Sequence, residues 1–149
     1  MSDPTPISAT VTIDAEPEAV WSVVSDLRRM PDFSPELRKA FVRGTPGVGA
    51  TIIGINRRGL VVWPTASKVV RWERNVAVAW KTRESGATWV YELSKAPGGT
   101  EVTARRVLPK FTKGTSLLAP VIGGAAGHDR ELSDGLRTTL ERIKASIEG

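Results

Sequence analysis

The sequence predicts an α+β fold: one strand, two short helices, six further strands and one long C-terminal helix. Three observations predict this order. Apolar and polar residues alternate in several short segments, as they do in half-buried strands. Turn residues separate the segments after residue 38, which indicates an antiparallel meander. Leucine and isoleucine recur at spacings of three and four near the C-terminus, which is typical of an amphipathic helix.

The first part of the chain predicts a strand followed by two helices. Residues 7–15 (ISATVTIDA) alternate between apolar and polar side chains. The next segment, 16–27 (EPEAVWSVVSDL), has Pro17 where a first helical turn accepts proline, and valines follow at helical spacing. Pro31 and Pro35 limit the segment after it to a short turn of helix.

The middle of the chain predicts six consecutive antiparallel strands. They are expected at residues 38–44, 51–59, 65–75, 76–85, 87–96 and 100–109. A glycine loop, GTPGVGAT (44–51), joins the first two strands, and we place the next turn at Arg58-Gly59. The loop lacks the Gly-Lys-Ser/Thr ending of a phosphate loop and leads into a strand, so we interpret it as a structural turn.

The C-terminal part begins with an irregular, glycine-rich segment, 113–127, and ends in a helix of about five turns over 128–149. The apolar stripe of this helix consists of Leu132, Leu136, Leu140, Ile143 and Ile147. Gly135 lies inside the helix, where glycine costs about 1 kcal/mol relative to alanine. A helix accepts that cost where a ligand or a strand must approach its backbone closely.

Composition restricts the class of protein. A chain of 149 residues, 40% hydrophobic and 25% charged, fits one globular domain spanning 1–149. The net charge is +5, from 21 basic and 16 acidic residues. Because the basic residues form only short pairs among residues of opposite sign, we expect a solvated basic surface. No nucleic-acid-binding motif is present, so nucleic acid is not expected as a partner.

Metal and cofactor chemistry is not expected. The chain has no cysteine and a single histidine, His128, which argues against disulfides and zinc sites. The N-terminus lacks the basic and apolar segments of a signal peptide, and no apolar run is long enough to span a bilayer. We therefore expect a cytoplasmic protein without a cofactor.

The order of these elements resembles the SRPBCC (START-like) superfamily, and within it the bacterial polyketide cyclase/dehydrase branch. The segments that carry the resemblance are IDAEPEAVWSVVSDLRRMPDFSP, TPGVGAT, the meander and GHDRELSDGLRTTLERIKASIEG. The resemblance covers the whole chain. It implies a helix-grip fold, in which a curved seven-stranded antiparallel sheet surrounds the long C-terminal helix and two short helices follow the first strand. It also implies a cavity for an apolar or amphipathic ligand between sheet and helix.

Strand alternation indicates which residues face that space. We expect the inner face to carry Trp72, Trp80, Trp89 and Tyr91, closed by Leu132 and Leu136 from the helix. Val70 is expected to accompany Trp72. Two alternatives remain open: the tryptophans line a ligand cavity, or they simply fill the core.

Arg106 is expected to point inward, because it shares a strand face with Val102 and Ala104. An inward guanidinium needs a carboxylate, carbonyl groups, water or an anionic ligand. The same alternation sends the strand glutamates outward. Arg106 therefore either binds the polar head of a ligand, with Tyr91 as a second hydrogen-bonding group, or extends to the rim with its head in water.

These observations favour a protein that binds a small hydrophobic or amphipathic molecule, such as a lipid, an isoprenoid or a polyketide-like compound. The alternative is an aromatic polyketide cyclase/dehydratase-type enzyme, in which Arg106 or Tyr91 would polarise a carbonyl. No inward histidine or carboxylate is expected, so no catalytic residue is assigned. A protein-interaction role with a vestigial cavity is a third, weaker hypothesis, and a homodimer stays open.

Overall fold

The computed structural model describes residues 7–108 and 125–149, and side chains within residues 125–132 are not described. The strands are β1 (Ile7–Ile13), β2 (Leu37–Arg43), β3 (Thr51–Arg58), β4 (Val61–Glu73), β5 (Ala77–Thr82), β6 (Thr88–Ala96) and β7 (Gly99–Val107). The helices are α1 (Pro17–Val24), the 3-10 helix η1 (Leu27–Arg29), α2 (Met30–Phe33) and α4 (Ala125–Glu148). Most of the glycine-rich segment expected at 113–127 lies outside the described residues.

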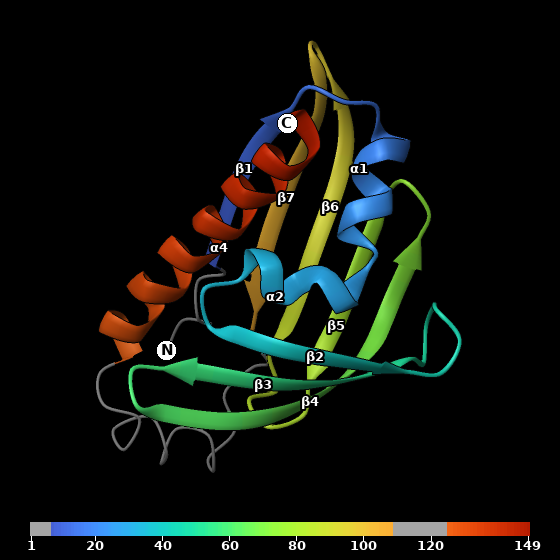
Figure 1. The fold of residues 1–149 in the computed structure, drawn as a ribbon. Coiled ribbons are helices and arrows are strands. Elements are labelled where there is room, and N and C mark those ends of the chain that lie inside the picture. Colours follow the sequence, from blue (N-terminus) through green and yellow to red (C-terminus); the bar gives the residue numbers. More distant parts are fainter. Residues whose placement is uncertain (1–6, 109–124) are drawn as a thin grey trace.

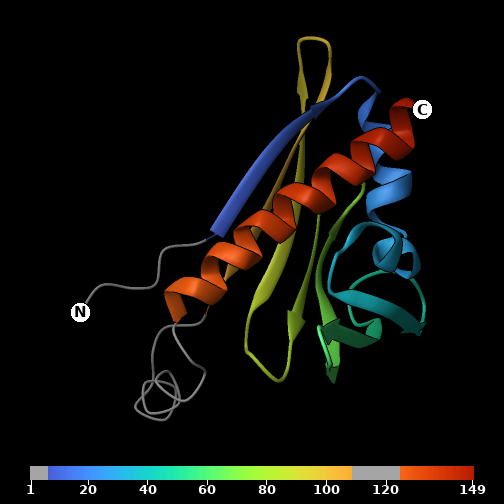
Figure 2. The same cartoon turned by 60° about the vertical axis from the view of Figure 1, so that its left-hand side comes forward.

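The seven strands form one antiparallel sheet in the order β1-β7-β6-β5-β4-β3-β2. Strands β2 to β7 are neighbours in chain order, as the meander predicts, and β1 joins the sheet beside β7. The sheet is strongly curved, and α4 lies across its inner face (Figures 1 and 2). The expected α+β arrangement, with short helices after the first strand and a long helix held by the sheet, is confirmed.

Helix α4 supplies the centre of the core. Its residues Leu136, Leu140 and Ile143 are buried in one cluster with apolar residues of the sheet and of α1. Two polar contacts fix the end of the helix against β1. Lys144 Nζ donates a hydrogen bond to the carbonyl oxygen of Thr12 at 2.6 Å, and the backbone N–H of Asp14 donates to Glu148 Oε2 at 2.8 Å. The helix is therefore held along the first strand.

Strand β4 begins at Val61, four residues earlier than expected, and the turn before it is Gly59-Leu60 instead of Arg58-Gly59. The sequence-based boundary at residue 65 was wrong, since the strand continues through Pro64. Strand β5 pairs with β4 only from Ser67 onward, so at Pro64 one side of β4 is an edge. A residue without an N–H is tolerated at such an edge.

Gly99, at the start of β7, has φ +143°, and a Cβ atom added there would overlap the carbonyl oxygen of Ile13. We expect Gly99→Ala to lower the free energy of unfolding by roughly 3 kcal/mol or more, from backbone strain and overlap together. Gly98 (φ +83°) has no neighbour within 4 Å of its added Cβ, so Gly98→Ala should lose only about 1–2 kcal/mol. Urea denaturation of both variants checks this, and equal losses would contradict it.

Candidate functional site

The inner face of the sheet carries two neighbouring rows of side chains that cross several strands. The strand register places the first row in the order Ile7, Arg106, Trp89, Trp80 and Val69. The second row runs Ala9, Ala104, Tyr91, Val78 and Trp72. The structure thus brings together five residues that strand alternation placed on one face: Trp72, Trp80, Trp89, Tyr91 and Arg106.

The aromatic side chains in these rows pack on one another. Trp80 stacks on Tyr91, with ring centroids 5.5 Å apart and an interplanar angle of 15°. Trp72 meets Trp21 of α1 edge to face at 5.3 Å. Trp21 is buried, and strand alternation could not identify it because it lies on a helix. The rings therefore form two packed pairs, one within the sheet and one that joins the sheet to α1.

Val70 does not accompany Trp72, which corrects the sequence-based prediction. The pairing of β4 with β5 shifts between Val69 and Arg71, so a bulge lies at Val70. Val69 is 1% exposed and Val70 is 47% exposed. Because a bulge inserts one residue into the alternation, Val69 and Trp72 both face inward although three positions separate them.

Arg106 lies inside the protein. Only 6% of it is exposed, which excludes the position at the rim with its head in water. Its neighbour Arg105 points to the outer face, where it forms an ion pair with Glu92 at 2.8 Å. Arg71 bonds the same carboxylate at 3.1 Å. As strand alternation predicted, Glu92 is on the outer face, so the inner rows combine aromatic rings with one buried guanidinium.

Tyr91 is buried in the row next to the one that contains Arg106. Burial raises the pKa of its phenol well above the usual value. The cause is desolvation, which disfavours the phenolate. The hydroxyl therefore stays protonated at neutral pH and can donate a hydrogen bond. An arginine keeps its charge under the same conditions. Tyr91 and Arg106 together provide a neutral and a charged donor among the mostly apolar side chains of the two rows.

Of the two α4 residues predicted to close the site, the structure describes the side chain of one. Leu136 is buried, 4% exposed, and belongs to the core cluster. The side chain of Leu132 lies outside the described residues, as does that of His128. Gly135 is next to Leu136, and a Cβ atom added there would be 3.6 Å from Cγ of Pro35. A Cβ atom would therefore make only an ordinary van der Waals contact with Pro35, and the described residues show no approach close enough to require glycine at this position.

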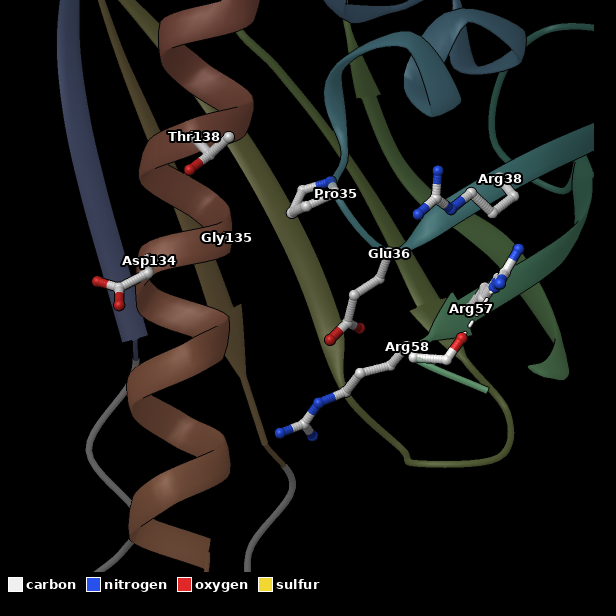
Figure 3. Close-up of a pocket in the computed structure, with 9 residues that line it drawn as sticks. Pro35, Glu36, Arg38, Arg57, Arg58, Asp134, Gly135 and Thr138 are labelled. Atoms are coloured by element: carbon white, nitrogen blue, oxygen red, sulfur yellow. Dashed lines mark hydrogen bonds between the residues drawn. The ribbon is translucent and has the colours of Figure 1, made fainter. Parts of the chain in front are cut away.

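A hollow of about 410 Å³ opens where α4 faces this segment and the ends of β2 and β3 (Figure 3). Its volume is in the range of small-molecule sites. Its lining is mostly polar and charged: Pro35, Glu36, Arg38, Arg57, Arg58, Gly59, Asp134, Gly135 and Thr138. In Figure 3 the side chain of Arg58 extends from the hairpin toward α4, and Asp134 points away from β2 and β3. Arg57 Nε is held by the carbonyl oxygen of Gly59 at 2.9 Å.

A second, smaller hollow of about 170 Å³ lies beneath the glycine loop. Trp72 and Val69 line it from the sheet, and Gly44 and Gly47 line it from the loop. The two hollows are not lined by Trp80, Trp89, Tyr91 or Arg106. Sequence reasoning missed the cationic hollow, because Arg38, Arg57 and Arg58 come together only when β2 and β3 pair.

The described residues offer no cluster of three histidine, aspartate or glutamate side chains that could hold a metal ion. Over the same residues, none of the helices has the length and apolar character needed to cross a bilayer. The two inner rows contribute aromatic rings, the hydroxyl of Tyr91 and the guanidinium of Arg106, and the buried hydroxyls of Ser67 and Thr82, 2.8 Å apart, follow the first row along β4 and β5.

Comparison with known proteins identifies a family and a fold. A family described as polyketide cyclase/dehydrase and lipid transport matches residues 4–148. No curated protein sequence matches the chain. Among solved structures, the di-domain ARO/CYC StfQ from the steffimycin biosynthetic pathway has a TM-score of 0.77 at 15% identity, over 96% of this chain and 50% of StfQ.

Two further structures are similar in the same way. KanY protein has a TM-score of 0.76 at 20% identity over 100% of both chains. The di-domain ARO/CYC BexL from the BE-7585A biosynthetic pathway has a TM-score of 0.74 at 23% identity, over 97% of this chain and 50% of BexL. This chain thus spans half the length of the two di-domain proteins. At these identities the likeness establishes the fold alone.

The buried phenol of Tyr91 predicts how stability depends on alkaline pH. The pKa is near 10 in the unfolded chain and higher in the folded protein, so the phenol contributes full stability below about pH 10. Above that pH the unfolded state loses its proton first, and the free energy of unfolding should fall by about 1.4 kcal/mol per pH unit. Urea denaturation at alkaline pH, for the wild type and Tyr91→Phe, measures the part due to this group.

The chain has one tyrosine, so the ultraviolet absorbance of tyrosinate gives a direct control. Phenolate absorbance that appears near pH 10 while the protein is still folded would contradict the assignment. An equally steep loss of stability in Tyr91→Phe would assign the alkaline transition to other groups.

Proposed function

The chain belongs to the polyketide cyclase/dehydrase and lipid transport family, and we propose that it binds a small apolar or amphipathic molecule between the sheet and α4. The observation that carries the proposal is the inner face itself, where Trp72, Trp80, Trp89 and Tyr91 occupy two adjacent rows. Apolar walls with few polar groups are typical of small-molecule sites. A ligand that buries about 200 Å² of apolar surface there gains roughly 5 kcal/mol.

Arg106 and Tyr91 specify the polar end of this ligand. The guanidinium can donate two parallel hydrogen bonds to a carboxylate, and the protonated phenol can donate a third to the same head. Both groups lie in neighbouring rows, with Trp89 directly opposite Arg106 and Ala104 directly opposite Tyr91. The proposed ligand class is therefore an amphipathic molecule with an apolar body and a carboxylate or another oxygen-rich head.

The hollow beside α4 is the proposed entrance. It opens at Gly135, between the helix and the segment that contains Pro35, and Arg38 and Arg57 border it from the strands. Its cations would attract an anionic head, and the aromatic face would then receive the apolar body. Entry would require the aromatic side chains to rearrange, because Trp80 and Tyr91 are stacked on each other.

A cyclase-type enzyme is the second candidate. The family description includes cyclase and dehydrase activity, and a poly-ketone chain is itself an oxygen-rich, amphipathic ligand. Arg106 and Tyr91 would then polarise a ketone oxygen by hydrogen bonding, so that a neighbouring carbon can attack the carbonyl carbon. The inner rows contain no general base, since their members are aromatic, apolar or cationic. The carrier function is therefore the first choice.

The proposed protein acts as a single domain over residues 1–149. It works in the cytoplasm, and its partner is the small molecule. The family match from residue 4 to residue 148 supports the single-domain assignment. Nothing in the inner face requires a cofactor or a second copy of the chain.

The two adjacent arginines of β7 provide a matched test. We expect Arg106→Gln to weaken binding of a fluorescent long-chain fatty acid about tenfold or more, because a hydrogen bond to a charged group contributes about 1.5–3 kcal/mol. Binding of the corresponding fluorescent alcohol should change little. Arg105→Gln removes an arginine of the outer face and should leave both affinities unchanged. Fluorescence titration of the wild type and the two variants, with the fatty acid and with the alcohol, measures these affinities.

Several results would contradict the proposal. If the wild type binds neither probe, the inner face is a filled core. If Arg105→Gln and Arg106→Gln weaken fatty-acid binding equally, general surface charge is responsible. Turnover of a poly-ketone substrate that slows in Tyr91→Phe would replace the carrier function with the cyclase function.

A further inference from the structure

The excess of positive over negative charge in this protein comes from one part of the chain. Residues 37–72 contain no aspartate or glutamate, yet they hold seven of the 21 lysines and arginines. The other 14 basic residues share the rest of the chain with all 16 acidic residues. This corrects the sequence-based expectation of interspersed charge. The seven cations are Arg38, Lys39, Arg43, Arg57, Arg58, Lys68 and Arg71.

Residues 37–72 form β2, β3 and most of β4, and these strands occupy one end of the sheet (Figure 1). Arg38, Lys39, Arg43 and Arg57 are exposed. In the part of the chain that the structure describes, none of these four forms an ion pair with a carboxylate. The nearest acidic residues along the hollow are Glu36 and Asp134. This end of the sheet therefore presents a positive surface to solvent.

The same strands expose apolar side chains at the tip of the β3–β4 hairpin. Leu60 is 96% exposed, Val61 is 63% exposed and Val62 is 60% exposed. Gly59 adopts φ 62°, which turns the chain and leaves Leu60 at the extremity. In the register of the hairpin Arg58 is opposite Val61 and Arg57 is opposite Val62. An apolar tip is thus directly flanked by two arginines.

We propose that this hairpin tip, residues 57–62, docks the protein onto an anionic lipid surface. Leu60 and the two valines would enter the boundary between head groups and acyl chains, and the flanking arginines would contact lipid phosphates. Peripheral membrane segments combine apolar area with basic residues in this way. The inference goes beyond ligand binding, because it concerns the exposed tip of the hairpin and holds whether or not the inner face binds a molecule.

Charge complementarity selects the lipid surface over two other occupants. A second copy of the chain would bring the same acid-free strands together, and their like charges would repel. Nucleic acid would satisfy the arginines but leaves the three exposed apolar side chains unexplained. A negatively charged bilayer accommodates both features. Docking would also bring the hollow lined by Arg57, Arg58 and Gly59 close to the membrane.

Vesicle flotation tests the proposal with the full chain. We expect wild-type protein to float with vesicles of phosphatidylcholine that contain phosphatidylglycerol, to bind pure phosphatidylcholine poorly, and to dissociate as salt is raised. Arg57→Gln should lower the partition coefficient about fivefold, since one basic residue near an anionic surface contributes about 1 kcal/mol. Leu60→Ser should lower it about tenfold.

Two variants outside the hairpin are the controls. Val76 is an exposed apolar residue before β5, 48% exposed, and Arg137 is an exposed cation of α4. Val76→Ser and Arg137→Gln should leave vesicle binding unchanged, and circular dichroism verifies that all four variants are folded. Equal binding to neutral and anionic vesicles, or equal loss in the controls, would overturn the proposal. Self-association that Leu60→Ser abolishes, without vesicle binding by the wild type, would assign the tip to a second copy instead.

Discussion

The packing of α4 along the inner face of a curved sheet is the constraint on which the other features depend. A sheet of seven strands has an apolar inner face that must be covered, and one amphipathic helix supplies the cover through Leu136, Leu140 and Ile143. Lys144 and Glu148 fix the end of that helix to the backbone of Thr12 in β1 and of Asp14, which follows β1. Where the helix passes the segment between α2 and β2, the cover is incomplete, and the 410 Å³ hollow opens at Gly135.

Much of the inner face could be predicted from the sequence, because strand alternation is a local property. The orientation of Trp80, Trp89, Tyr91 and Arg106 follows from the parity of β5, β6 and β7, which have no bulge between their pairs. Val70 shows the limit of this method. A single extra residue in β4 reverses the parity, and nothing in the local pattern of residues reveals a bulge.

The rest of the site depends on contacts between residues that are far apart in the sequence. Trp21 belongs to a helix, and its packing on Trp72 arises only when α1 covers the sheet. The cationic hollow needs the pairing of β2 with β3 to bring Arg38 close to Arg57 and Arg58. A signal for it was nevertheless present in the sequence, since no acidic residue occurs between Glu36 and Glu73. Counting charges segment by segment, instead of over the whole chain, would have found it.

The protein combines an apolar interior with a positive end of the sheet. Family membership is compatible with both transport and cyclisation, and the fold does not choose between them. The choice rests on the inner rows, which provide hydrogen-bond donors in Arg106 and Tyr91 but no histidine or carboxylate. Such a face can hold and polarise an oxygen-rich head, and it lacks a group that would remove a proton.

The central claim is that a small molecule occupies the space between the sheet and α4. Mass spectrometry of the purified protein, under native and then denaturing conditions, tests it most directly. The account predicts a complex heavier than the chain by the mass of one small molecule, which denaturation releases, and whose amount falls in Arg106→Gln but not in Arg105→Gln. A protein that carries no such molecule, and that also fails to bind added fatty acid, would show that the aromatic rows are a filled core.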